Sequence, residues 1–250
     1  MDFTVEKYKK LLKTLQDLTY TFQSFEEFIQ NPQEKSIVLR HDVDLLPKNS
    51  LLFAKIQAEL GIKGVYYFRA VPESWDEKII IEIASLGHEI GYHYENLTTC
   101  KGDVSMAIKD FEQNLSRLRK LVPVSTICMH GSPLSKFDSK DLWKTKKYQD
   151  FDLIGEPYFY VDFSKVLYLT DTGRRWNGEK VSVRDKVNST TNLNLKSTED
   201  VIRYFENGTD FKQIMFTFHP QRWNDNPYLW TKEFLFQSIK NQIKRFFFVK

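Results

Sequence analysis

The chain has 250 residues and a mass of 29.7 kDa; 41% of its residues are hydrophobic, 28% are charged and 15% are aromatic. This balance is that of a folded domain and excludes collagen-like, low-complexity and coiled-coil proteins. Because 36 lysines and arginines nearly cancel 33 aspartates and glutamates, the net charge is only +3, and the composition gives no support for nucleic-acid binding.

The first half of the chain is expected to alternate helices with strands. Leucines at helical spacing in the first 20 residues predict a helix, and the capping-box pattern of Ser24 and Glu27 predicts a second, short one. Strand patterns follow at residues 36–41, 64–70, 88–94 and 125–130, with helical patterns between them at 46–60, 77–86 and 104–121. A second capping box, from Ser74 to Glu77, is expected to begin the helix 77–86. Strands that alternate with helices predict a parallel sheet wound in βα units and closed, wholly or partly, into a barrel.

The second half of the chain is less regular. Short strands separated by turns are expected at residues 158–163, 165–171 and 180–185, in an order that fits a meander. A capped helix is then expected over 198–207, followed by a strand at 213–220 and a final helix over about 228–247. We expect the irregular residues 136–196 to form a β-rich insertion that supplies substrate specificity, since long loops over strand ends usually do so.

Nothing in the sequence divides the chain into separate units. It contains no internal repeat, no low-complexity linker and no break in composition, so one α/β domain over residues 1–250 is expected. Within this domain we expect an N-terminal helical extension in residues 1–35, the core motifs in residues 37–223 and a C-terminal helix in residues 224–250.

The sequence predicts a reducing compartment. Cys100 and Cys128 are far apart and outside any Cys-x-x-Cys pair, so neither a disulfide framework nor a thiolate zinc site is expected. The first 20 residues lack the uninterrupted apolar segment of a signal peptide, and no run of 18 apolar residues occurs that would cross a bilayer. We therefore expect a cytoplasmic protein with no transmembrane segment.

All five histidines fall at the carboxyl end of an expected strand or in the turn beside one: His41, His88, His93, His130 and His219. In α/β barrels and open α/β sheets this end of the strands forms the ligand-binding face, so distant histidines converge there. A single histidine in a strand is more often a satisfied core residue. Five histidines with adjacent aspartates favour a functional site.

Two clusters indicate how such a site would be divided. Asp42 and Asp44 are two positions apart and share a face of an extended chain, so one carboxylate can bind a metal while the other stays free as a base. The alternative is a charged strand end that pairs with Arg40. His88 and His93 are five apart, so on a strand they point to opposite faces and are not expected to bind the same ion.

Five motifs taken together resemble the polysaccharide deacetylase family, also called the NodB-homology carbohydrate esterases. They are HDVD, GHEIGYHYE, MHGSP, TDTGRRW and FTFHPQRW, which occur in the order of the family and lie within residues 37–223. The resemblance implies a distorted (β/α) barrel that uses a divalent metal, usually zinc, to remove acetyl groups from N-acetylated sugars. Most members have two adjacent aspartates in the first motif, and the HDVD spacing resembles a variant branch of the family.

The resemblance also implies the roles of three catalytic groups. Asp42 corresponds to the general base and Asp44 to a metal ligand, and the reverse assignment stays open. His219 matches the histidine that acts as the general acid. The hydrolysis would then proceed by attack of water on an acetamide, with Asp42 accepting a proton and His219 donating one to the departing amine.

The metal ligands depart from the usual pattern. His93 matches the first of two ligand histidines in the family, but the second position is Leu97, which cannot bind a metal. Glu95 and His130 are the candidates for the third ligand. We favour His130, since imidazole suits zinc well and Glu95 would then orient a neighbouring side chain.

The remaining candidates surround these groups. His88 matches a histidine that precedes the ligand pair, which implies a supporting or structural role, and His41 lies next to the base. By resemblance, Asp171 and Trp176 support the wall of the site, where Trp176 either stacks on a sugar or fills a loop. Three arginines would orient a carboxylate or bind a substrate phosphate, or would instead lie at the surface or pair with Asp42 or Asp171: Arg40, Arg174 and Arg222.

The expected substrate is a cytosolic N-acetylated carbohydrate, such as a sugar nucleotide, a lipid-linked sugar or another precursor of a surface polysaccharide. Two alternatives stay open. The chain is an amidase that acts on a small non-sugar C–N bond, or it is a degenerate member that binds glycans without hydrolysing them, because Leu97 replaces a ligand. The sequence leaves the sugar, the metal and the oligomeric state undetermined.

Overall fold

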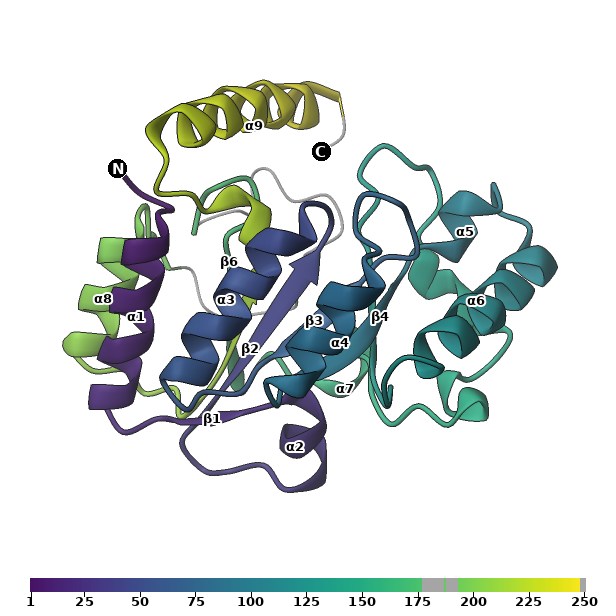
Figure 1. Cartoon of the computed structure of the whole chain (residues 1–250), viewed down its shortest axis with the longest axis horizontal. Coiled ribbons are helices and arrows are strands. Elements are labelled where there is room, and N and C mark those ends of the chain that lie inside the picture. Colours follow the sequence, from purple (N-terminus) through teal and green to yellow (C-terminus); the bar gives the residue numbers. More distant parts are fainter. Residues whose placement is uncertain (177–186, 188–192, 248–250) are drawn as a thin grey trace.

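The computed structural model describes residues 1–176, 187 and 193–247, and within them seven strands form one parallel sheet (Figure 1). The strands are β1 (Thr21–Gln23), β2 (Ser36–Val43), β3 (Val65–Phe68), β4 (Glu89–Tyr94), β5 (Ile127–Met129), β6 (Val166–Thr170) and β7 (Gln213–Phe218). They follow the order β5-β4-β3-β2-β7-β6, and β1 and β3 share the other edge of β2. β5 and β6 do not pair with each other in the described part of the chain. The fold is therefore an open, distorted (β/α) barrel, and the expected fold class is confirmed.

Helices cover this sheet on its outside. They are α1 (Val5–Asp17), α2 (Phe25–Gln30), α3 (Pro47–Glu59), α4 (Glu77–Ser85), α5 (Asn96–Thr99), α6 (Val104–Arg119), α7 (Pro157–Tyr160), α8 (Thr198–Glu206) and α9 (Pro227–Phe247). Figure 1 shows α1 beside α8, α3 beside α4, and α9 across the end to which β2 points. None of the helices in the described residues has the length and apolar character needed to cross a bilayer.

The first two helices each begin after a residue whose side chain accepts a hydrogen bond from a free backbone N–H group of the first turn. The hydroxyl of Thr4 accepts the N–H of Lys7 at 3.2 Å, and the predicted capping box of Ser24 and Glu27 is present at the start of α2. α1 then buries the three leucines at positions 11, 12 and 15, and it packs against α8. Satisfied N-termini of this kind stabilise a helix by about 1 kcal/mol each.

The capping box predicted at Ser74 is wrong. Asp76 caps α4 instead, because its carboxylate accepts the N–H groups of Lys78 and Ile79 at 3.1 and 3.2 Å. The Ser74 hydroxyl accepts the N–H of Arg69 at 3.1 Å. It also donates a hydrogen bond of 2.5 Å to a carbonyl oxygen at the end of β2. Ser74 therefore ties the ends of β2 and β3 together.

The irregular middle contains less β structure than the sequence predicts. The prediction of a strand at residues 158–163 is wrong, because the helix α7 occupies residues 157–160 and Glu156 caps its N-terminus. The strand expected at residues 165–171 is present as β6, but it runs parallel to β7, which rules out a meander. Short 3₁₀ helices at Ser139–Lys144 and Tyr148–Phe151 fill much of the remainder. The strand expected at 180–185 lies outside the described residues.

His41 belongs to the core, so its assignment to the surroundings of the site is wrong. Its ring is fully buried and stacks between Tyr66 and Phe218, with ring centroids 4.1 and 5.7 Å away. Nδ1 bonds to the carbonyl oxygen of Val65 at 3.0 Å, and Nε2 lies 3.1 Å from the Tyr8 hydroxyl. Successive side chains of a strand alternate between its faces, so His41 points away from its neighbours Arg40 and Asp42.

Acidification is expected to destabilise the fold through His41. Burial lowers the pKa of His41 to about 3, whereas a histidine in an unfolded chain titrates near about 6.5. Between these values the unfolded chain binds a proton that the folded chain does not, so the free energy of unfolding falls as the pH decreases from 6.5. Going from pH 7 to pH 5 should cost about 2 kcal/mol at this residue alone.

Urea unfolding across this pH interval measures the effect. His41→Gln keeps a donor and an acceptor but does not titrate, so the variant should show a flatter dependence of its unfolding free energy on pH. An unchanged slope in His41→Gln would contradict the assignment of the pH dependence to this residue.

Candidate active site

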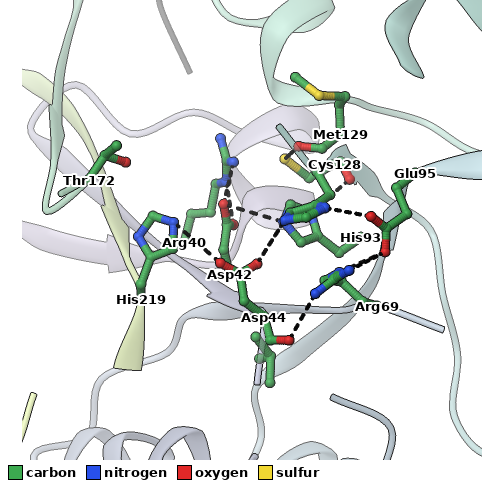
Figure 2. A network of polar contacts seen from close by, with 12 residues as sticks. Arg40, Asp42, Asp44, Arg69, His93, Glu95, Cys128, Met129, Thr172 and His219 are labelled. Atoms are coloured by element: carbon green, nitrogen blue, oxygen red, sulfur yellow. Dashed lines mark hydrogen bonds and ion pairs between the residues drawn. The ribbon is translucent and has the colours of Figure 1, made fainter. Parts of the chain in front are cut away.

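Six strands are each followed directly by a polar residue. Asp44 follows β2, Arg69 follows β3, Glu95 follows β4, His130 follows β5, Asp171 follows β6 and His219 follows β7. Because the strands are parallel, these residues gather at one edge of the sheet. All of them except Asp171 line a cavity of about 480 Å³, to which α9 also contributes Gln237 and Lys240. Figure 2 shows the polar contacts among several of these side chains and their neighbours.

The carboxylate of Asp44 lies between two imidazole rings. Its Oδ1 atom is 3.6 Å from Nε2 of His93 and 3.6 Å from Nε2 of His130, and the three side chains offer ligand atoms within 4.8 Å of one another. This Oδ1 atom is buried, and no described residue forms a hydrogen bond with it. Nδ1 of His93 bonds to the carbonyl oxygen of Cys128 at 2.9 Å and Nδ1 of His130 to Glu95 at 2.8 Å, so both Nε2 atoms face Asp44.

A divalent cation fits this donor set. Zinc in catalytic sites binds three side chains of this kind and keeps a further position for water. The partners of the two Nδ1 atoms fix the tautomer in which Nε2 has its lone pair free. Burial opposes the charged form of Asp44, but His130 and His93 lower its pKa well below its ordinary range. Oδ2 of Asp44 accepts a hydrogen bond of 3.3 Å from Gln221, so the buried Oδ1 atom of this ionised carboxylate is the one that a cation would complete.

Of the two candidates for the third ligand, the geometry favours His130. Oε2 of Glu95 bonds to the far side of the His130 ring, and Oε1 accepts a hydrogen bond of 2.7 Å from Nε of Arg69. Although burial opposes its charged form, His130 and Arg69 lower the pKa of Glu95 to about 2. Leu97, at the position of the family's second ligand, lies in α5 and is buried in the hydrophobic core.

Replacing Glu95 by glutamine should weaken zinc binding through His130. The carboxylate of Glu95 orients the ring of His130 and raises the basicity of that ring, and an amide would do this only weakly. Loss of such a supporting carboxylate lowers metal affinity by about 10- to 100-fold. Competition with a chelator measures this affinity in wild type, in Glu95→Gln and in the control Glu82→Gln, which removes a half-exposed carboxylate that pairs with Lys55 outside the cavity. Equal affinities for all three proteins would count against the orienting role of Glu95.

Asp42 is engaged in a bidentate ion pair beside this group. Nε and Nη2 of Arg40 donate to its two carboxylate oxygens at 2.8 and 2.7 Å, and both side chains are buried. Arg40 also contacts Tyr158, whose hydroxyl accepts a 3.2 Å hydrogen bond and whose ring lies 5.0 Å from the guanidinium. Burial opposes the charge of Asp42, but Arg40 and His93 lower its pKa. Asp42 is therefore kept ionised, and its Oδ2 lies 3.6 Å from Nε2 of His93.

His219 lies on the other side of Asp44. Its Nε2 is 3.9 Å from Oδ2 of Asp44, and its Nδ1 is 2.5 Å from Oδ1 of Asp171. Asp171 is fully buried and also accepts hydrogen bonds from Nη1 of Arg222 at 3.2 Å and from the indole of Trp223 at 2.6 Å. Burial opposes its charge, but His219 and Arg222 lower the pKa of Asp171. The carboxylate thus fixes the ring of His219 with Nε2 toward the cavity.

Other residues expected at the site lie elsewhere. Trp176 does not line the cavity: its ring is buried against Phe216, Phe218 and Trp223, and it cannot stack on a sugar there. Arg174 is also outside the cavity and lies over the ring of Trp230 at 4.6 Å.

His88 directly precedes β4, so its expected place at the carboxyl end of a strand is wrong, and its position is structural. Its Nε2 bonds to the carbonyl oxygen of Ala54 at 2.9 Å, and its Nδ1 accepts the N–H of Gly64 at 3.2 Å. It therefore connects α3 to the start of β3 and β4, and it lies apart from His93, as the spacing of the two residues predicted. Arg40 and Arg222, by contrast, both line the cavity.

Sequence reasoning missed three residues beside the site. Arg69 follows β3, so the strand-end rule applied to the histidines would have found it. Tyr158 reaches the cavity from α7, where a strand was expected, and no sequence pattern indicated it. Cys128 pairs with His93 in the sheet and offers its sulfur within 4.8 Å of ligand atoms of Asp42 and His93, a group formed only by the pairing of β4 with β5.

No protein-family model and no curated protein matches the chain. Solved structures to which it is similar include carbohydrate esterases and deacetylases. One is a CE4 esterase of Streptococcus mutans, at 12% identity and a TM-score of 0.47, with 92% of this chain and 90% of that chain covered. Another is PdaA of Bacillus subtilis, a family 4 carbohydrate esterase, at 10% identity and a TM-score of 0.41, with 92% of this chain and 84% of that chain covered. A third is the peptidoglycan deacetylase PdaC of Bacillus subtilis, at 13% identity and a TM-score of 0.42, with 87% of this chain and 99% of that chain covered.

Proposed function

We propose that the chain is a metal-dependent hydrolase of the polysaccharide deacetylase family that removes the acetyl group from an N-acetylated sugar. One observation carries this proposal: the cavity floor combines Asp44, His93 and His130 with an ionised carboxylate, Asp42, on one side and a carboxylate-bound imidazole, His219, on the other. A cation site between a proton acceptor and a proton donor is the constellation that hydrolysis of an amide requires.

The residues of the chain would divide the reaction as follows. Asp44, His93 and His130 would bind a divalent ion, zinc by preference, which when bound supplies a Lewis acid and lowers the pKa of water towards about 7. Asp42, kept ionised by Arg40, accepts the proton of the attacking water. His219 donates a proton from Nε2 to the departing amine, which is otherwise a very poor leaving group.

Asp171 acts as a positioning residue in this scheme. Its carboxylate fixes the tautomer of His219 and stabilises the charged ring, while Arg222 and Trp223 keep that carboxylate ionised and oriented. Arg40 has the corresponding position behind Asp42. Each proton-transferring group thus has a buried partner of opposite charge.

We propose a cytoplasmic location and a substrate that is a precursor of a surface polysaccharide, as a sugar nucleotide or as a lipid-linked sugar. Two alternatives, an amidase for small non-sugar amides and a glycan-binding protein without activity, lead to different results in one assay. The assay measures acetate and free amine released from UDP-N-acetylglucosamine, from chitooligosaccharides and from a panel of simple acetamides.

Acetate release confined to the sugar substrates supports the proposal. Release from the simple acetamides alone would instead identify an amidase. Glycan binding without product, from protein that contains metal, would identify an inactive member and overturn the proposed activity.

A further inference from the structure

The helix α9 directs two polar side chains into the protein and most of its exposed apolar side chains away from it. Gln237 and Asn241 are buried, where Nε2 of Gln237 donates to Asn241 and Nδ2 of Asn241 donates to the carbonyl oxygen of Gly173, each at 2.8 Å. Phe234 is exposed and stacks on Trp230, and the other large apolar residues that are exposed on α9 occupy the opposite face: Tyr228, Leu229, Leu235, Phe236, Ile239 and Ile243. At 100° per residue these six positions form one continuous stripe along the helix, which we call the apolar face of α9.

The charge beside this face is positive. Lys232 lies within the stripe and is exposed, and Lys240 is exposed at its margin, where its ammonium lies 4.1 Å from the ring of Phe236. The one acidic residue of the helix sequence, Glu233, is partly buried, and the charges of Arg222 and Arg174 oppose the rise that burial causes in its pKa. The apolar face of α9 therefore combines large apolar side chains with cations and with no anion.

The apolar face is continuous with the mouth of the cavity. Ile243 and Leu134 line the cavity, but Ile243 is 43% exposed and Leu134 is 75% exposed. Leu46, just beyond the end of β2, is 54% exposed. Figure 1 shows that α9 lies across the end to which β2 points, the end where the cavity residues gather. The apolar rim and the apolar face thus belong to the same end of the barrel.

We propose that the apolar face of α9 docks in the headgroup region of an anionic lipid bilayer and places the cavity mouth against the membrane. Amphipathic helices that lie in a bilayer interface bury apolar side chains and add attraction between lysines and anionic lipids. A lysine at the centre of such a face extends its ammonium to the phosphates. A second copy of the chain fits less well, because a two-fold contact would bring Lys232 of both copies into an apolar interface without a negative partner.

The docking has a consequence for the substrate that rests on the proposed function. A cavity that opens at a bilayer favours a lipid-linked N-acetylated sugar over a freely diffusing one. The docking itself depends on no activity, so its failure and the failure of the proposed deacetylation are measured separately.

Co-sedimentation with vesicles tests the docking. The vesicles are phosphatidylcholine alone and phosphatidylcholine with one third phosphatidylglycerol, each at low and at high salt. Leu235→Glu combined with Ile239→Glu places charge on the face without touching the cavity lining, and Ile81→Glu combined with Met106→Glu is the control at exposed apolar positions on α4 and α6. Lys232→Glu tests the charge alone.

Wild type and the control are expected to bind the anionic vesicles at least about tenfold more strongly than the neutral ones, with binding weakened by salt. The Leu235→Glu/Ile239→Glu variant should lose at least about tenfold in binding, and Lys232→Glu should lose binding and most of its salt dependence. Thermal unfolding verifies that all variants are folded.

Two results would overturn the proposal. The first is that wild type does not bind either kind of vesicle, or that Leu235→Glu/Ile239→Glu binds as well as the control. The second is a wild-type dimer in light scattering that becomes a monomer in this variant, with no vesicle binding, which would identify the apolar face as a contact between two copies.

Discussion

Asp44→Asn is expected to abolish zinc binding and with it acetate release, whereas Asp42→Asn should lower acetate release by about 10²- to 10⁴-fold and leave zinc bound. Oδ1 of Asp44 lies 3.6 Å from Nε2 of both His93 and His130, so the substitution by asparagine removes a charged ligand from the centre of the group. Asp42 is instead bound to Arg40 on both oxygens, and its loss removes the base. Loss of a general base lowers kcat by about 10²- to 10⁴-fold.

Stability needs a control in this comparison. Asp42→Asn leaves the buried guanidinium of Arg40 without its partner, which costs about 3–5 kcal/mol when a buried pair is broken. The double variant Arg40→Met/Asp42→Asn removes both charges and should recover much of that stability while staying inactive. Metal content, unfolding by urea and acetate release are measured on all of these proteins. The opposite pattern, with metal lost in Asp42→Asn and retained in Asp44→Asn, would show that the two aspartates have exchanged roles.

His219→Gln is expected to lower kcat by about 10²- to 10⁴-fold while the metal stays bound. His219 approaches Asp44 only to 3.9 Å, and its other nitrogen is bound to Asp171, so it is suited to proton transfer and is not part of the three-ligand group. The defect should depend on the leaving group. An acetanilide with a nitro group expels an amine that needs little protonation, and the variant should lose less activity toward it than toward an acetylated amino sugar.

Asp171→Asn provides the matched comparison for His219→Gln. It keeps the imidazole but removes the charge that orients it, so its kcat should fall by a smaller factor with the same dependence on the leaving group. Equal losses for both leaving groups in His219→Gln would contradict the role of His219 as the acid. Loss of zinc in the same variant would assign it to the metal group instead.

The barrel and the position of the site followed from two simple patterns in the sequence. Strand patterns alternated with helical ones, and this order has few solutions other than a parallel sheet. In such a sheet all carboxyl ends meet, so Asp44, His93, His130 and His219 could be brought together before any contact was known. The structure places their ligand and ring atoms within a few ångströms of one another, although their roles stay predictions.

The failures have equally definite causes. The sequence neighbours of His41 suggest a place at the site. Because side chains alternate along a strand, His41 instead points into the core, where it packs between Tyr66 and Phe218. Trp176 comes from a turn, where no periodicity sets the direction of a side chain, and it packs into the core. Residues 158–163 contain enough aromatic and β-branched residues for a strand, yet the cap at Glu156 begins a helix there.

The choice between Glu95 and His130 depended on tertiary structure. Both residues follow a strand directly, so the sequence alone predicts that either of them can be a metal ligand. The pairing of β4 with β5 puts the two side chains in contact, and Arg69 from β3 then engages the carboxylate of Glu95. Three strands therefore determine which of the two residues faces Asp44.

The most direct test of the central claim is a zinc titration of metal-free protein, with bound metal and acetate release followed together. The account predicts that acetate release from an N-acetylated sugar increases with added zinc up to one equivalent and then stays constant. In His93→Ala neither binding nor acetate release should appear. Folded wild type that binds no zinc, or that releases acetate equally well without it, would contradict the metal-dependent deacetylase proposed here.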